Sequence, residues 1–101
     1  MDFIIKDIWR NIKRLNKKFT IISAEGLHLR TAGILANELC KYDCDSEILY
    51  KGDMINAKSL LNIMAACIKC GDEIELQCNG IDEKVAIEKA EKLIASDFNV
   101  D

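Results

Sequence analysis

The alternation of short strand-like and helix-like segments, with one tight turn between two strands, constrains the fold of this chain more than any other feature. Residues 46–50 and 54–57 form short apolar segments, and the turn formers Lys51, Gly52 and Asp53 separate them. A connection this short joins neighbouring antiparallel strands. The sequence therefore predicts a β-hairpin within an antiparallel sheet.

Two further strands and three helices complete the expected order. Strands are predicted by the β-branched residues of segment 19–24 and by the apolar-polar alternation of segment 74–78. Helices are predicted by apolar side chains at helical spacing in residues 29–42, 59–66 and 82–95. Helices interleaved in this way with antiparallel strands cover one face of the sheet. We therefore expect an α/β (α+β) fold of the open-faced β-sandwich type, with a four-stranded antiparallel sheet and three helices on one face, in the order βαββαβα.

Residues 3–15 form a separate amphipathic pattern before the first expected strand. Ile5, Ile8, Trp9 and Ile12 recur at steps of three or four residues, which predicts a helix. We interpret residues 1–17 as an N-terminal helical extension and residues 18–101 as the single domain. The helix could pack on its own sheet, bind a second copy or lie on a membrane. Trp9 favours contact with protein over contact with a membrane.

Composition limits the classes of function. The 101 residues suffice for one compact domain, and 31% charged residues with a net charge of −3 argue against disorder and against a nucleic-acid partner. No apolar run approaches the roughly 20 residues that span a bilayer, and the N-terminus lacks the apolar core and cleavage site of a signal peptide. We therefore expect a cytoplasmic protein.

Five cysteines raise the question of a metal or redox site. Cys67 and Cys70 form a CxxC pair at the end of the second helix of the expected domain. Cys40 and Cys44 form a CxxxC pair at the end of the first helix, and neither pair has a nearby histidine. Cysteine is also an ordinary small core residue, and Cys78 is interpreted as a strand residue. We expect reduced thiols, no metal and no cofactor, with a metal-binding module as the most distant alternative.

The single histidine, His28, stands where a strand is expected to give way to a helix. The first amides of a helix, here those of Leu29 and Arg30, have no intrahelical acceptors and lie at the positive end of the helix dipole, so they suit an anion. Near pH 7 a neutral histidine ring offers a free lone pair and can act as a nucleophile. Arg30 would hold phosphoryl oxygens through charge-assisted hydrogen bonds, and Gly26 permits the chain reversal before His28. From these residues alone, a surface histidine that caps the helix is the simpler interpretation.

Two segments resemble the HPr phosphocarriers of the bacterial sugar phosphotransferase system. The first is GLHLRTAG at residues 26–33, which is similar to the family's active-site pattern of glycine, an aliphatic residue, histidine, any residue, arginine, proline and alanine. The second is NAKSLLNIMA at residues 56–65, which is similar to the family's regulatory-serine segment, and the separation between the two segments also fits. The resemblance covers about residues 18–96 and implies an HPr-like domain.

The resemblance implies that His28 accepts a phosphoryl group on a ring nitrogen from enzyme I, which draws on phosphoenolpyruvate. His28 would then donate the group to a sugar-specific IIA component, with Arg30 stabilising it. Such a protein is a stoichiometric carrier with a phosphohistidine intermediate, not an enzyme, and it needs no metal. The alternative is an HPr-fold regulatory adaptor that acts by protein binding, through phosphorylated Ser59 or an apolar surface, without a role in sugar transport.

Ser59 is placed to cap the helix that follows it, and the resemblance adds a regulatory role, because a dedicated kinase phosphorylates the matching serine in some bacteria. A serine kinase and a transcriptional regulator are therefore further candidate partners. The resemblance also makes Leu60, Leu61 and Met64 candidates for an apolar surface that docks partners beside the active-site histidine. Core packing is the competing interpretation for each of the three, and Ile63 is assigned to the core.

Two residues depart from the family pattern near the histidine. Thr31 stands where the family usually has proline, whose fixed φ suits the first turn of a helix, so we expect a less rigid helix start. Glu25 stands where many members carry a small polar residue, and its carboxylate would favour the protonated form of the His28 ring and repel phosphate. We therefore expect slower transfer, or transfer tuned to another partner.

Overall fold

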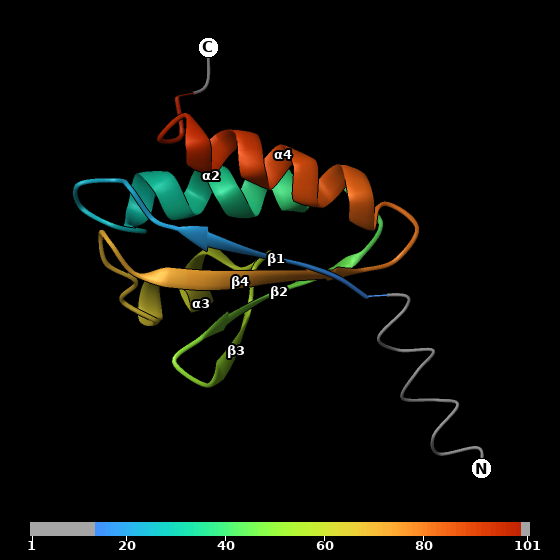
Figure 1. The fold of residues 1–101 in the computed structure, drawn as a ribbon, viewed down its shortest axis with the longest axis horizontal. Coiled ribbons are helices and arrows are strands. Elements are labelled where there is room, and N and C mark those ends of the chain that lie inside the picture. The colour runs from blue at the N-terminus through green and yellow to red at the C-terminus, as the bar shows by residue number, and fades with distance from the viewer. Residues whose placement is uncertain (1–13, 100–101) are drawn as a thin grey trace.

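A computed structural model describes residues 14–99, and within them four strands and three helices form a layered fold (Figure 1). The strands are β1 Arg14–Thr20, β2 Asp45–Tyr50, β3 Asp53–Asn56 and β4 Glu73–Asn79. The helices are α2 Leu29–Leu39, α3 Leu60–Ala65 and α4 Glu83–Ala95. The predicted order βαββαβα is confirmed.

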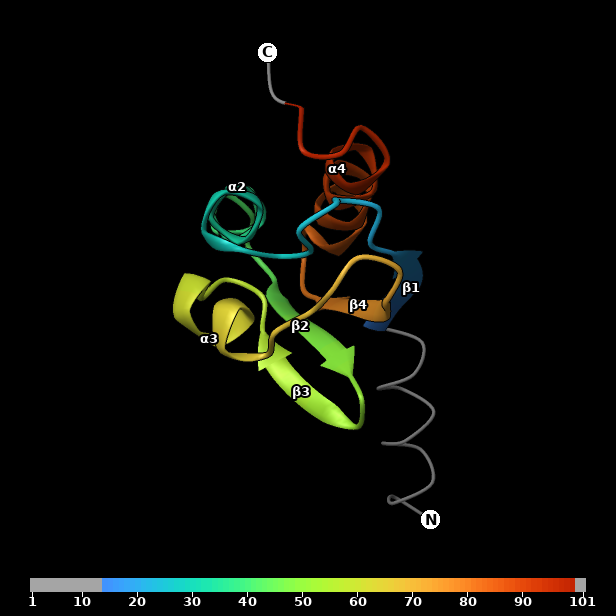
Figure 2. The same ribbon diagram turned by 90° about the vertical axis from the view of Figure 1, so that its left-hand side faces the viewer.

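The four strands form an antiparallel sheet in the order β1-β4-β2-β3. Ile74, Leu76 and Cys78 of β4 alternate along the strand and are fully buried beneath the helices. The three helices lie on the same side of the sheet, and within residues 14–99 no helix covers the other face (Figure 2). The predicted open-faced sandwich is therefore confirmed.

A two-residue turn joins β2 to β3. Lys51 and Gly52 both have positive φ, of 50° and 85°, and Tyr50 pairs with Asp53 across the turn. Positive φ at both central positions is the geometry that matches the twist of a two-residue hairpin, and glycine adopts it without steric cost. The predicted hairpin is confirmed.

The first strand begins earlier than predicted. A helix was expected through residue 15 and a strand over residues 19–24, but residues 14–20 are β1. The side chains follow a period of two: Leu15 and Phe19 pack against the core, and Lys17 forms an ion pair with Glu91 of α4. All of β1 pairs with β4, and this pairing stabilises the strand. Leu15 therefore lies in a strand, although its spacing from the preceding apolar residues also fits a helix.

Residues 1–13 lie outside the described residues. The helix predicted for residues 3–15, and the helical extension of residues 1–17, therefore stay predictions for that part of the chain. Residues 14–17 belong to the sheet instead. Among the helices of residues 14–99, none combines the length and hydropathy needed to span a bilayer.

The core lies between the sheet and the helices. Ile63 of α3 is fully buried there, as predicted. Phe98, three residues beyond the end of α4, is 1% exposed and anchors the C-terminal turn in the same core. The other large side chains with almost no exposure are Ile21, Leu35, Leu39, Ile48, Ile74 and Leu76.

Candidate functional site

The loop between β1 and α2 is fixed against the segment that follows α3. The amide of Leu27 donates a hydrogen bond to the carbonyl of Ile68 at 3.0 Å, and the Leu27 side chain is buried. Gly26 has a φ of +71° and lies so close to this segment that a Cβ would sit 2.2 Å from the Ile68 oxygen. Both the conformation and the lack of space therefore require glycine at residue 26.

His28 follows this loop and is the N-cap residue of α2, with an extended backbone (φ −108°, ψ −167°). Its carbonyl accepts a hydrogen bond from the amide of Ala32 at 2.8 Å. The amides of Leu29 and Arg30 occupy the first two helical positions, which have no intrahelical acceptors. The His28 side chain is 35% exposed, so an anion or a partner can reach the ring at the positive end of the helix dipole. The structure thus places His28 at the helix start that the sequence predicted, but the strand before it ends at Thr20 and not just before the histidine.

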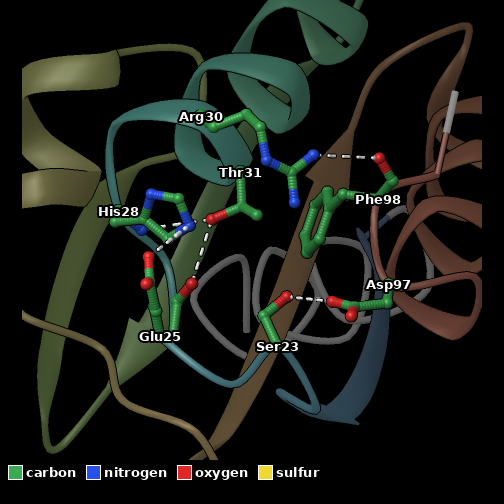
Figure 3. Close-up of polar contacts among 8 residues, drawn as sticks. Ser23, Glu25, His28, Arg30, Thr31, Asp97 and Phe98 are labelled. Carbon is green, nitrogen blue, oxygen red and sulfur yellow. Dashed lines mark hydrogen bonds and ion pairs between the residues drawn. The ribbon is translucent and has the colours of Figure 1, made fainter.

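The hydroxyl of Thr31 connects both ends of the turn before the helix (Figure 3). It donates a hydrogen bond to the carbonyl of Gly26 at 3.0 Å and accepts one from the amide of His28 at 3.1 Å. Thr31 is fully buried. The position where the family usually has proline is therefore occupied by a side chain that bonds to the loop. These bonds constrain the helix start, contrary to the less rigid start expected from the sequence.

Glu25 lies next to the histidine ring, as the sequence suggested. Its Oε2 atom is 3.5 Å from Nε2 of His28 (Figure 3). The Glu25 side chain is 77% exposed, so water and salt screen its charge. The carboxylate is close enough to the ring to repel an approaching phosphate.

A turn after α4 closes the other side of the site. Arg30 donates a hydrogen bond from Nη1 to the carbonyl of Phe98 at 3.4 Å, and the hydroxyl of Ser23 donates one to the carboxylate of Asp97 (Figure 3). Asp97 and Phe98 both have positive φ, which turns the chain back toward α2. The C-terminal turn therefore contacts both the loop before His28 and the arginine after it.

Ser59 is the N-cap residue of α3. Its Oγ accepts a hydrogen bond from the amide of Asn62 at 3.2 Å, so the predicted cap is confirmed. A phosphate on this hydroxyl would lie at the start of a short helix of six residues.

The three apolar residues proposed for docking differ in exposure. Leu61 is 76% exposed and Met64 is 37% exposed, whereas Leu60 is half-buried against the core. Leu60 also lies close to α2: a Cβ atom added to Gly33 of that helix would be 3.9 Å from Cδ1 of Leu60. Helices α2 and α3 are neighbours on the same side of the sheet (Figure 2). Leu61 and Met64 therefore present apolar surface on the helix adjacent to the one that His28 begins.

A family model described as the PTS HPr component phosphorylation site matches residues 15–96. The matched region contains His28, Arg30 and Ser59. The chain belongs to the HPr phosphocarrier family.

Individual HPr relatives support this assignment. Phosphocarrier protein HPr of Mycoplasma capricolum subsp. capricolum is 40% identical over 73 residues, which are 70% of this chain and 82% of the relative. The crystal structure of HPr-C-His from Thermoanaerobacter tengcongensis superimposes with a TM-score of 0.82 at 28% identity and covers 86% of this chain and 98% of that one. A histidine-containing phosphocarrier protein of Mycoplasma gives a TM-score of 0.77 at 34% identity, covering 81% and 94% of the two chains. The resemblance inferred from the sequence, and the fold that it implied, are confirmed.

The cysteines of this HPr protein are free thiols in different surroundings. Cys44 and Cys78 are buried, and burial raises the pKa of the Cys78 thiol to about 11. Among residues 14–99, no three His, Cys, Asp or Glu side chains are arranged to hold a metal ion. The thiols exposed to solvent are those of Cys40, Cys67 and Cys70.

Sequence reasoning missed three neighbours of the site in this HPr domain: Ser23, Asp97 and Phe98. Ser23 and Asp97 are 74 positions apart, and no motif or periodicity connects them. The only signal for Phe98 is a large apolar side chain just after an amphipathic helix, which indicates burial but no contact with Arg30. The bonds of Thr31 could not be read from the sequence either, because they depend on where the Gly26 carbonyl points.

Proposed function

We propose that this HPr-family protein accepts a phosphoryl group on His28 from phosphoenolpyruvate-charged enzyme I and passes it to a sugar-specific IIA component. The observation that carries the proposal is the position of an accessible histidine at the N-terminus of α2, directly before two free helical amides. A phosphoryl group on the ring would meet these amides and the positive end of the dipole. The protein would act as a stoichiometric carrier with a phosphohistidine intermediate, not as an enzyme.

The proposed step is a substitution at phosphorus. The lone pair of a His28 ring nitrogen forms a bond to phosphorus while the bond between phosphorus and the donor residue of enzyme I breaks. Transfer to the IIA component repeats the exchange, with His28 as the leaving group. Because the chemistry is an exchange at one atom, the protein contributes by positioning the ring and neutralising charge.

Glu25 favours one ring nitrogen as the nucleophile. Its carboxylate lies beside Nε2 and suits a ring that carries its proton there. The lone pair is then on Nδ1, and we propose that Nδ1 accepts the phosphoryl group.

Arg30 would stabilise the transferred group. Its hydrogen bond to the Phe98 carbonyl is long, at 3.4 Å, and joins a charged donor to a neutral acceptor. Phosphoryl oxygens would offer the guanidinium shorter, charge-assisted bonds. We therefore propose that Arg30 exchanges the carbonyl for the phosphoryl group, next to the amides of Leu29 and Arg30.

The α3 patch, formed by Leu60, Leu61 and Met64, is proposed to dock enzyme I and IIA components. Leu61→Ser should raise the concentration of this protein that half-saturates enzyme I by about tenfold, since an exposed apolar anchor is lost. Ile81→Ser is the matched control, because Ile81 is 85% exposed but follows β4 at the opposite end of the sheet from His28. An equal effect of both substitutions would argue against the patch.

Ser59 is proposed as a regulatory site for a serine kinase. A phosphate there would add about two negative charges beside the α3 patch, where enzyme I would dock. Phosphorylated Ser59 and the patch are also the surfaces through which a transcriptional regulator would bind in the adaptor alternative.

Intact mass spectrometry tests the central proposal. The protein is incubated with enzyme I and phosphoenolpyruvate, and the wild type is compared with His28→Ala. We expect one acid-labile phosphoryl adduct on the wild type and none on the variant. An adduct that persists in His28→Ala would exclude His28 as acceptor. The lack of an adduct on the wild type with its cognate enzyme I would favour the adaptor.

A further inference from the structure

We propose that Thr31 is a positioning residue for phosphoryl transfer, because its buried hydroxyl holds the backbone of His28 in the orientation that the transfer needs. This inference rests on the proposed function of His28 as phosphoryl acceptor. Nothing in the family pattern assigns a role to a hydroxyl at this position, where proline is usual.

The hydroxyl of Thr31 is the only side-chain group within residues 14–99 that hydrogen-bonds to the backbone of both Gly26 and His28. It accepts from the His28 amide at 3.1 Å and donates to the Gly26 carbonyl at 3.0 Å. Thr31 is fully buried, so water cannot replace either partner without a local opening. These two bonds fix the distance between residues 26 and 28.

The segment that follows α3 completes the constraint from the other side. The Leu27 amide is bonded to the carbonyl of Ile68, and a Cβ on Gly26 would clash with the backbone of Ile68 and Lys69. The three residues before the helix are therefore held by Thr31 at both ends and by Ile68 in the middle. With its amide fixed in this way, the backbone of His28 has little freedom to move, so the point from which its ring extends stays fixed relative to the first amides of α2.

A hydroxyl can make both bonds through a single oxygen atom. The Gly26 carbonyl needs a donor and the His28 amide needs an acceptor, and one hydroxyl supplies both. A proline at residue 31 would fix its own φ but could not bond to either group. Threonine therefore constrains the loop by a different physical means, through tertiary hydrogen bonds instead of ring geometry.

A matched set of variants of the full chain tests this role. Thr31→Val keeps the shape of the side chain and removes the hydroxyl, whereas Thr31→Ser keeps the hydroxyl and removes the methyl group. Thr20→Val is the control, because Thr20 is the other threonine of the chain and is exposed on β1. Phosphoryl transfer from phosphorylated enzyme I is followed by rapid quench over a range of acceptor concentrations, and exchange of the His28 amide is followed by NMR.

We expect Thr31→Val to lower the maximal transfer rate about tenfold, because a small misplacement of a reacting group is costly. The half-saturating concentration should change by less than about twofold, since the α3 patch is untouched. The His28 amide should exchange at least about tenfold faster in Thr31→Val. Thr31→Ser should transfer within about twofold of the wild type and keep the amide protected.

A folded Thr31→Val protein that transfers at the wild-type rate would overturn the role of Thr31 while leaving His28 as acceptor. If Thr31→Val does not fold, Thr31→Ser provides the test. Transfer near the wild-type rate with a protected His28 amide supports the positioning role of the Thr31 hydroxyl. Slow transfer with a protected His28 amide overturns it. If the wild type and Thr20→Val both accept no phosphoryl group, the proposed function fails, and the role of Thr31 in transfer fails with it.

Discussion

The guanidinium of Arg30 lies 3.4 Å from the carbonyl oxygen of Phe98, which joins the first turn of α2 to the turn after α4 across 68 positions of sequence. Phe98 is anchored in the core, so its carbonyl is a fixed point, whereas Arg30 is exposed. The contact holds the guanidinium beside the start of the helix.

Replacement of Arg30 should slow transfer without unfolding the domain. Arg30→Ala removes the donors proposed to neutralise the phosphoryl group, and we expect the rate from enzyme I to fall about 100-fold. Arg30→Lys keeps the charge but loses the planar fork, so a loss of about tenfold is expected. Rapid-quench assays measure both, and urea unfolding should show stabilities within about 0.5 kcal/mol of the wild type. An unchanged rate in Arg30→Ala would remove Arg30 from the mechanism.

Neutralising Glu25 should speed the acceptance of the phosphoryl group. The carboxylate beside Nε2 of His28 repels the incoming phosphate, but its exposure limits the effect. We expect Glu25→Gln to raise the transfer rate about two- to fivefold at low salt, and the gain should shrink as ionic strength rises. Glu73→Gln is the control, since Glu73 is an exposed carboxylate on β4. Slower transfer in Glu25→Gln would mean that the carboxylate assists the reaction.

The cap of α3 predicts a stability difference that does not depend on phosphorylation. Ser59→Ala leaves the Asn62 amide without its side-chain acceptor and should lower the free energy of unfolding by about 1 kcal/mol. Ser59→Asp keeps an acceptor at the N-cap and should be much closer to the wild type. Urea unfolding compares the three proteins. Equal losses in the two variants would show that the cap contributes little.

Tyr50 and Asp72 predict a dependence of stability on pH. The hydrogen bond from the Tyr50 hydroxyl is the main reason that the pKa of Asp72 lies below its ordinary value of 3.8, and the same bond raises the pKa of Tyr50 above 10.0. The stabilisation of the folded protein by this hydrogen bond is therefore complete between the ordinary pKa of Asp72, 3.8, and the ordinary pKa of Tyr50, 10.0. It is lost as pH falls through the lowered pKa of Asp72, and also as pH rises through the raised pKa of Tyr50.

Tyr50→Phe removes this bond. The difference in the free energy of unfolding between wild type and Tyr50→Phe should be largest near neutral pH and should shrink toward both acid and alkaline pH. Urea unfolding at a series of pH values measures the difference. A difference that stays constant across the range would show that packing, not the hydrogen bond, accounts for the effect of the substitution.

The sequence alone predicted the elements that local patterns specify. Turn chemistry predicted the hairpin at Lys51 and Gly52. The spacing of apolar residues predicted the helices and the burial of Ile63. The need of a first-turn amide for an acceptor predicted the cap at Ser59. The position of His28 at a helix start follows in the same way from the strand before it and the helix after it. Each of these features depends on residues within a few positions of one another.

The tertiary structure alone decided which distant groups meet. Leu15 fits both a helical and a strand pattern, and only pairing with β4 settles that it lies in β1. Two hydrogen bonds, from Ser23 to Asp97 and from Arg30 to Phe98, join residues near opposite ends of the domain's sequence. The hydrogen bonds of Thr31 depend on how the loop before His28 packs against Ile68. A hydrogen bond needs two groups within about 3 Å in the right orientation, and across long separations only the packed core determines that geometry.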